Sequence, residues 1–74
     1  MAKTKSHVSN KVREYRFRQG EMTQQALAES VGVARQTIIA IEQGRFCPSL
    51  ESALRIAQVF GSSVDELFVL EDAD

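Results

Sequence analysis

The chain has 74 residues and a formal net charge of −1. A domain this small buries only about 60% of its unfolded surface, which leaves little room for a catalytic pocket. No apolar run of about 18 residues is present and the N-terminus lacks the apolar core of a signal peptide, which excludes a transmembrane helix and favours the cytoplasm. The lone Cys47 and the single histidine argue against a disulfide, a metal site and an enzyme, so we expect no cofactor.

The chain divides into three parts by pattern. Residues 1–8 lack periodicity and are predicted to form a flexible arm, residues 9–70 one helical domain, and residues 71–74 an acidic tail. Two interpretations of the arm remain open, namely solvated basic residues or side chains that follow DNA phosphates. The residues concerned are Lys3, Lys5 and His7.

A first helix is expected between an N-cap at Ser9 or Asn10 and a C-terminus near Arg18, with Gly20 ending it. Its inward side chains are predicted to be Val12, Tyr15 and Phe17. Three residues separate Gly20 from Gln24, and the geometry of this turn does not follow from the pattern.

Two short amphipathic helices meet at Gly32. The earlier one is predicted to follow an N-cap at Thr23 and the later one to cover Arg35 to Gln43. Gly32 can adopt the positive φ that ends a helix, and Val33 then lies as an apolar residue under the turn. Their inward positions are Leu27, Ala28, Val31, Ile38 and Ile41. This arrangement is the sequence form of a helix-turn-helix, with a bend of about 90 to 120°.

Two further helices complete the domain. Pro48 predicts a loop, after which Ser49 is placed to N-cap a fourth helix that ends at Gly61. The inward stripe of that helix is predicted to comprise Leu50, Ala53, Leu54, Ala57 and Phe60. Ser63 and Glu66 have capping-box spacing for a last short helix through about Phe68. Because no alternating β pattern is visible, the predicted fold class is all-α, with five helices.

Short motifs occur in a characteristic order from Val12 to Phe68. They are T-Q-x-x-L-A at residues 23–28, G-V at 32–33, R-Q-T-I at 35–38, I-E-x-G at 41–44, P-S-L at 48–50, A-L-x-I-A at 53–57 and D-E-L-F at 65–68. In this order they closely resemble the Cro/repressor-type (XRE) helix-turn-helix family of transcriptional regulators. The resemblance implies a five-helix repressor-like DNA-binding domain.

The third predicted helix has the composition of a DNA reader. Arginine can donate two hydrogen bonds to guanine and glutamine can pair with adenine in the major groove, and Arg35 and Gln36 lie at the helix start, where such helices approach base edges. The alternative is that both are solvated. Thr37 either contacts DNA or bonds its own backbone, and Ile39 with Ala40 contacts either thymine methyl groups or another protein surface.

The resemblance also implies phosphate contacts and one internal pair. Gln24, at the start of a helix where the dipole attracts phosphate, is expected to anchor the DNA backbone, and the alternative is an ordinary first-turn residue. Gln43 and Arg45 are phosphate candidates by the same resemblance. Arg16 and Glu42 are expected to form a structural ion pair. Ala34 departs from the Ser or Thr usual in the family at this N-cap, so no phosphate contact is assigned to it.

Charge is unevenly distributed. Residues 1–45 carry a formal charge of +4 and residues 46–74 carry −5, so one basic face can meet a polyanion while the acidic half points away. The sequence therefore predicts a sequence-specific double-stranded DNA-binding regulator, a repressor that acts as a homodimer on a roughly palindromic operator.

Three apolar residues exceed what one small core needs and are candidates for the dimer surface: Phe46, Val69 and Leu70. The alternative function is a protein-interaction module, antitoxin-like or a bridging factor, with these residues as its working surface and DNA binding as a secondary property.

Overall fold

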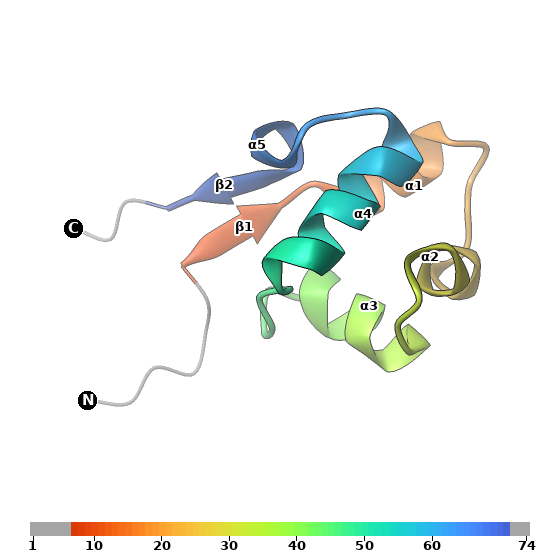
Figure 1. The fold of residues 1–74 in the computed structure, drawn as a ribbon, viewed down its shortest axis with the longest axis horizontal. Helices are drawn as coiled ribbons and strands as arrows, with labels where there is room; N and C mark the ends of the chain where they lie inside the picture. Colours follow the sequence, from red (N-terminus) through yellow and green to blue (C-terminus); the bar gives the residue numbers. More distant parts are fainter. Residues whose placement is uncertain (1–6, 72–74) are drawn as a thin grey trace.

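The computed structural model describes residues 7–71 and contains, within them, five helices and two short strands (Figure 1). In chain order these are β1 (Val8–Asn10), α1 (Val12–Arg18), α2 (Gln24–Val31), α3 (Arg35–Glu42), α4 (Leu50–Phe60), α5 (Val64–Leu67) and β2 (Phe68–Leu70). Lys3 and Lys5 of the predicted arm, and residues 72–74 of the predicted tail, lie outside the described residues. None of these helices is long and apolar enough to cross a membrane.

The five-helix fold is confirmed, and its core lies where the helices meet. Every helix contributes at least one side chain to the core that is no more than 1% exposed. The six largest fully buried side chains are Val12, Leu27, Ile38, Ile41, Ile56 and Leu67. Ala28 is equally buried at the junction of α2 with α3, where a small side chain permits close approach. Val33 packs partly buried against this core, as predicted.

The predicted helix-turn-helix junction is confirmed in its local chemistry. Thr23 Oγ1 accepts a hydrogen bond from the Ala26 N–H at 2.9 Å and so caps α2. Gly32 ends that helix in the left-handed region, with φ of 86°. Ala34 occupies the N-cap of α3 with extended backbone and without a side-chain bond. The chain therefore turns sharply into α3, which lies at the bottom of the molecule in Figure 1.

The predicted start of the first helix is wrong. Ser9 and Asn10 belong to strand β1, which also includes Val8 from the predicted arm and pairs antiparallel with β2. Lys11 is the N-cap of α1, while the Asn10 side-chain oxygen accepts the Val12 N–H at 3.1 Å. Three-residue strands are too short to show alternation, and this pairing joins the two ends of the domain, so no local pattern predicts it.

Three residues predicted to face inward are exposed. On α1 Phe17 is 51% exposed, and on α4 Leu50 and Leu54 are 72% and 54% exposed. The buried side of α4 instead contains Ala53, Ile56 and Ala57. Leu54 is rotated by about 100° from Ala53 because one residue advances a helix by that angle. The predicted stripe shared Ala53 and Ala57 with the buried side, but it extended to the Leu50 and Leu54 flank and so missed Ile56.

Candidate nucleic-acid interface

Helix α3 presents the predicted base-contacting residues on one accessible side. Its first turn exposes Arg35 and Gln36 to solvent, while Thr37, Ile39 and Ala40 are partly buried. Its opposite side is held by Ile38 and Ile41, which have 0% and 1% exposure. Burial of two side chains at i and i+3 fixes the rotation of the helix about its axis, so the first-turn polar groups are held outward.

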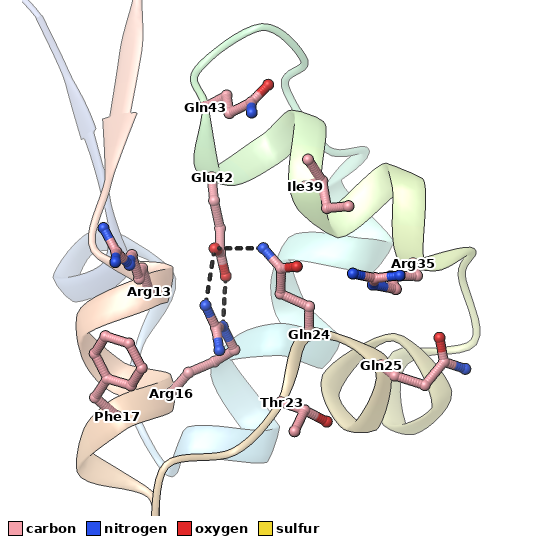
Figure 2. Close-up of a pocket in the computed structure, with 10 residues that line it drawn as sticks. All are labelled: Arg13, Arg16, Phe17, Thr23, Gln24, Gln25, Arg35, Ile39, Glu42 and Gln43. Atoms are coloured by element: carbon pink, nitrogen blue, oxygen red, sulfur yellow. Dashed lines mark hydrogen bonds and ion pairs between the residues drawn. The ribbon is translucent and has the colours of Figure 1, made fainter.

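The accessible side of α3 borders two hollows. One also involves α1 and the start of α2, and Figure 2 shows Arg35 and Ile39 on one wall, with Gln24 between them and α1. The other hollow is lined by Gln36, Thr37, Ala40, Arg45 and Phe46. The structure thus divides the predicted base-contacting residues between two neighbouring hollows that α3 separates.

The predicted pair of Arg16 and Glu42 forms the floor of the first hollow. Arg16 Nε donates to Glu42 Oε2 at 2.7 Å, and Arg16 Nη2 donates to Oε1 at 3.1 Å (Figure 2). Both side chains are at least nine-tenths buried, with 8% and 6% exposure. Two parallel bonds between planar groups give a strongly oriented contact, so α1 and the end of α3 are held at one distance.

Two further contacts complete this network. Arg16 Nη1 donates to the Met22 carbonyl oxygen at 2.7 Å, and Gln24 Nε2 donates to Glu42 Oε1 at 3.2 Å. Met22 lies in the turn between Gly20 and Gln24, whose geometry the sequence left open. There Gly20 and Glu21 both adopt positive φ, at 72° and 58°. Arg16 therefore links α1, the turn and α3.

The predicted phosphate-contacting residues lie in the two hollows beside α3. Gln24 lines the first hollow, where its amide donates to Glu42. Gln43 also lines it, from the C-cap of α3, and its side-chain oxygen accepts from Arg45 Nε at 2.8 Å. Arg45 borders the second hollow. The Gln43 contact restrains the Arg45 guanidinium beside α3.

Sequence reasoning missed three contributors to this region. Arg13 and Phe17 of α1 line the first hollow together with Arg16 (Figure 2). The spacing of Arg13 from Arg16, three residues on a helix, was the available signal, since it places the two on one face. Asn10 Nδ2 donates to the Ile41 carbonyl oxygen at 2.8 Å, which ties β1 to α3, and no sequence pattern indicates it.

Comparison with known protein families identifies the family to which this helical domain belongs. The HTH_3 helix-turn-helix family matches residues 12–67, which include every helix described above. The chain belongs to this family. The predicted Cro/repressor-type recognition is thereby confirmed, and the family relation supports a DNA-binding transcriptional regulator.

Individual relatives agree with the family match. An uncharacterised HTH-type transcriptional regulator of Methanocaldococcus jannaschii, MJ0272, is 46% identical over 65 residues, which cover 88% of this chain and 97% of the relative. The CTXphi transcriptional repressor RstR of Vibrio cholerae is 32% identical over 59 residues, 80% of this chain and 52% of RstR. The Bacillus subtilis regulator SinR, crystallised with DNA, has a TM-score of 0.66 and 29% identity, covering 73% of this chain and 86% of that structure.

Proposed function

We propose that this HTH_3 protein is a sequence-specific double-stranded DNA-binding repressor that acts as a homodimer on a roughly palindromic operator. The observation that carries the proposal is the first turn of α3, where Arg35 and Gln36 are exposed on a helix whose other side is locked into the core. Both are side chains that read base edges in the major groove, and neither is needed for packing.

The base contacts follow from the placement of five side chains on α3. Arg35 is assigned to a guanine and Gln36 to an adenine, each through a bidentate pair worth about 1–3 kcal/mol of discrimination. Thr37, Ile39 and Ala40 lie further along the accessible side, where their methyl groups are available to thymine methyls. Replacement of Ile39 by Ser is expected to weaken preference at A·T positions.

Phosphate contacts are assigned to the ends of the reading region. Gln24 retains a second amide hydrogen after its bond to Glu42, and it lies in the first turn of α2. Gln43 and Arg45 follow α3 and are positioned by their mutual hydrogen bond. Contacts of this kind fix the register of the protein on the duplex without reading its sequence.

Three exposed apolar side chains support the homodimer. Phe46 is exposed in the loop after α3, and Val69 and Leu70 are exposed in β2. A twofold pair would place two copies of α3 about 34 Å apart, one turn of DNA, and would match a palindromic site. Repression by occupying a promoter is supported by the relation to RstR, whose name describes a transcriptional repressor.

The test is fluorescence anisotropy with a labelled random duplex pool and with duplexes enriched from it, at several salt concentrations. Wild type is compared with the Arg35→Ala/Gln36→Ala double variant, and circular dichroism verifies that both are folded. We expect tight, salt-sensitive wild-type binding to a palindromic subset and loss of that preference in the variant, since phosphate contacts release counterions and base contacts specify sequence.

Equal, weak and unspecific binding by both proteins would contradict the proposal. The protein-interaction function would then account better for the exposed apolar residues Phe46, Val69 and Leu70. Salt separates the two readings further, because an apolar protein interface responds little to salt whereas a phosphate interface responds steeply.

A further inference from the structure

Arg13 is the one exposed arginine of α1 that faces the reading helix. It lines the hollow between α1, α2 and α3, opposite Arg35, and Figure 2 shows the two guanidinium groups on either side of the buried Arg16–Glu42 pair. Neither the motifs nor the predicted site residues gave α1 a role in binding. The hollow nevertheless joins Arg13 to Gln24 and Gln43, the two predicted phosphate-contacting residues in it.

The charges that line the hollow do not cancel. Three arginines and one glutamate line it, and Arg16 and Glu42 neutralise each other through their bidentate contact. Within residues 7–71, no carboxylate lies within ion-pair distance of Arg13 or Arg35. The hollow therefore carries two uncompensated positive charges above a neutral floor, which favours an anionic ligand.

The nearest acidic neighbour of Arg13 on its own helix is already engaged. Glu14 borders a smaller hollow on the other side of Arg13, and its carboxylate accepts from Arg18 Nη2 at 3.3 Å. Arg18 in turn lies over the Tyr15 ring, 5.0 Å from its centroid. Thus the two exposed arginines of α1 differ, because Arg18 has a carboxylate and an aromatic partner outside the first hollow and Arg13 has no carboxylate.

Phe17 explains how Arg13 is held. The Arg13 Cζ lies 5.4 Å from the centroid of the Phe17 ring, and the Arg16 Cζ lies 5.3 Å from it. A half-exposed aromatic ring in contact with two guanidinium groups attracts the exposed one and restricts its rotation. This contact also accounts for the exposure of Phe17, whose ring lies against arginine side chains and not in the core.

We propose that this hollow binds one phosphate group of the DNA backbone, with Arg13 as the principal donor and Phe17 as the residue that positions it. The inference rests on the proposed function, because it places the duplex against α3. With the first turn of α3 directed at base edges, a backbone strand that borders the groove passes beside the helix, and the side facing α1 presents Arg13 in the same hollow as Gln24. The planar guanidinium matches a phosphate in charge and in bidentate geometry.

The test measures the salt dependence of DNA affinity for Arg13→Gln and for the matched control Arg18→Gln. Each removes one positive charge from an exposed position of the same helix. We expect Arg13→Gln to weaken binding to enriched and random duplexes by the same factor and to reduce the slope of log affinity against log salt by about 0.9, the value for one phosphate. Between about 50 and 200 mM salt, wild type then loses about 3.5-fold more affinity than this variant.

Arg18→Gln is expected to leave the salt slope unchanged. Phe17→Leu keeps every charge, and we expect it to weaken affinity by a smaller factor than Arg13→Gln with an unchanged salt slope, because it affects only the position of the guanidinium. Circular dichroism and thermal melting verify that all three variants are folded.

Equal salt slopes for Arg13→Gln, Arg18→Gln and wild type would overturn the phosphate-site proposal. The proposed DNA-binding function would still stand in that case, provided that wild type binds DNA. A change in sequence preference in Arg13→Gln would also overturn it, because a phosphate contact carries no base information. If wild type itself binds no duplex, the proposed function fails, and this outcome is recognised before any variant is compared.

Discussion

At the scale of single residues, the Arg16–Glu42 pair has both a structural and a functional consequence. The sequence suggested this pair by resemblance, and the structure adds what resemblance did not supply, namely the Met22 carbonyl and the Gln24 amide as further partners. The pair is buried and fully bonded, so its loss affects the position of α1 against α3 as well as stability. Gln24 shares the Glu42 carboxylate, which couples a predicted phosphate contact to the same network.

We expect Glu42→Ala to destabilise the fold by about 3–5 kcal/mol, because it leaves the buried Arg16 guanidinium without a carboxylate. The free energy of unfolding of a domain is about 5–15 kcal/mol, so this substitution should remove a large share of it, and DNA affinity should fall in proportion to the folded fraction. Urea unfolding followed by circular dichroism measures the change.

The control for this prediction is Glu51→Ala. Glu51 pairs with Arg55 at 2.7 Å on α4, but both side chains are exposed, so its loss should cost less than about 1 kcal/mol. An equal effect of the two substitutions, or an unchanged melting temperature for Glu42→Ala, would show that burial of the Arg16 pair does not stabilise the domain.

Asp65 makes the stability of the fold slightly dependent on pH. Its pKa is lowered by the hydrogen bond that its carboxylate accepts from the Ser63 hydroxyl, at 2.7 Å, and by a bond from its own backbone N–H. Since the folded pKa is depressed, the ionised carboxylate stabilises the protein above the ordinary Asp pKa, and this contribution is lost as the pH falls through the folded value. The group is fully exposed, so the effect is small.

Asp65→Asn should therefore lower the melting temperature slightly at neutral pH, and the difference from wild type should be smaller near pH 2, since that pH lies below the ordinary Asp pKa of about 3.9. Thermal melting of wild type and variant at both pH values measures this. In a Ser63→Ala background the pH-dependent difference should shrink, because the principal cause of the shift is absent. A difference of the same size at both pH values would contradict the assignment.

At the scale of secondary-structure elements, the predictions agree with the structure where the deciding interactions are local in sequence, and they fail where residues far apart in sequence interact. Helices α2 to α5 begin and end within about one residue of their predicted bounds, because caps such as Thr23 and Ser49 and the positive φ of Gly32 are local properties. The pairing of β1 with β2 joins residues about sixty positions apart and has no local signature. The same reason explains why Arg13 was missed, since its role depends on what α3 and Gln24 place opposite it.

The N-cap of α3 offers a stabilising substitution. Ala34 has φ of −75° and ψ of 151°, the extended backbone of an N-cap, but no side-chain oxygen. We expect Ala34→Ser to supply that acceptor to an N–H in the first turn and to stabilise the fold by about 1 kcal/mol. For a domain of this size that corresponds to a rise of about 4–8 °C in melting temperature.

Two control variants test whether the hydroxyl group is the cause of this stabilisation. Thr23→Ala removes the bond to the Ala26 N–H and should lower the melting temperature by a similar amount. Ala34→Val adds volume at an exposed position without an acceptor and should give no gain. A rise for Ala34→Val equal to that for Ala34→Ser would show that the hydroxyl is not the cause.

At the scale of the whole molecule, charge and apolar surface have different locations in the chain. The basic half of the sequence forms β1 and α1 to α3, and the acidic half forms α4, α5 and β2, with α5 near the top and α3 near the bottom of Figure 1. Exposed apolar side chains lie mainly in the acidic half, where Leu50 and Leu54 of α4 add to the predicted candidates Phe46, Val69 and Leu70. Phe46 shares a hollow with Gln36, Thr37 and Ala40 of α3, so a dimer that leaves α3 accessible would have to be built on Val69 and Leu70 of β2.

From the proposed homodimer we expect Val69→Asp/Leu70→Asp to be a monomer at concentrations where wild type sediments as a dimer. Both side chains are exposed in β2 and neither belongs to the buried core, so the substitution should leave the monomer folded while placing charges in an apolar contact. Analytical ultracentrifugation measures the mass, and Ser30→Asp on the exposed side of α2 serves as the control, which should remain dimeric.

DNA binding gives a second, independent readout of the same dimer. Two linked reading helices require half-sites on one face of the duplex, so insertion of about 5 bp, half a turn, between the half-sites should abolish tight binding by wild type. The Val69→Asp/Leu70→Asp variant binds each half-site separately, so its weaker affinity should be the same with and without the insertion. If wild type is also indifferent to the insertion, the two copies are not rigidly linked on DNA, and the palindromic operator loses its physical basis.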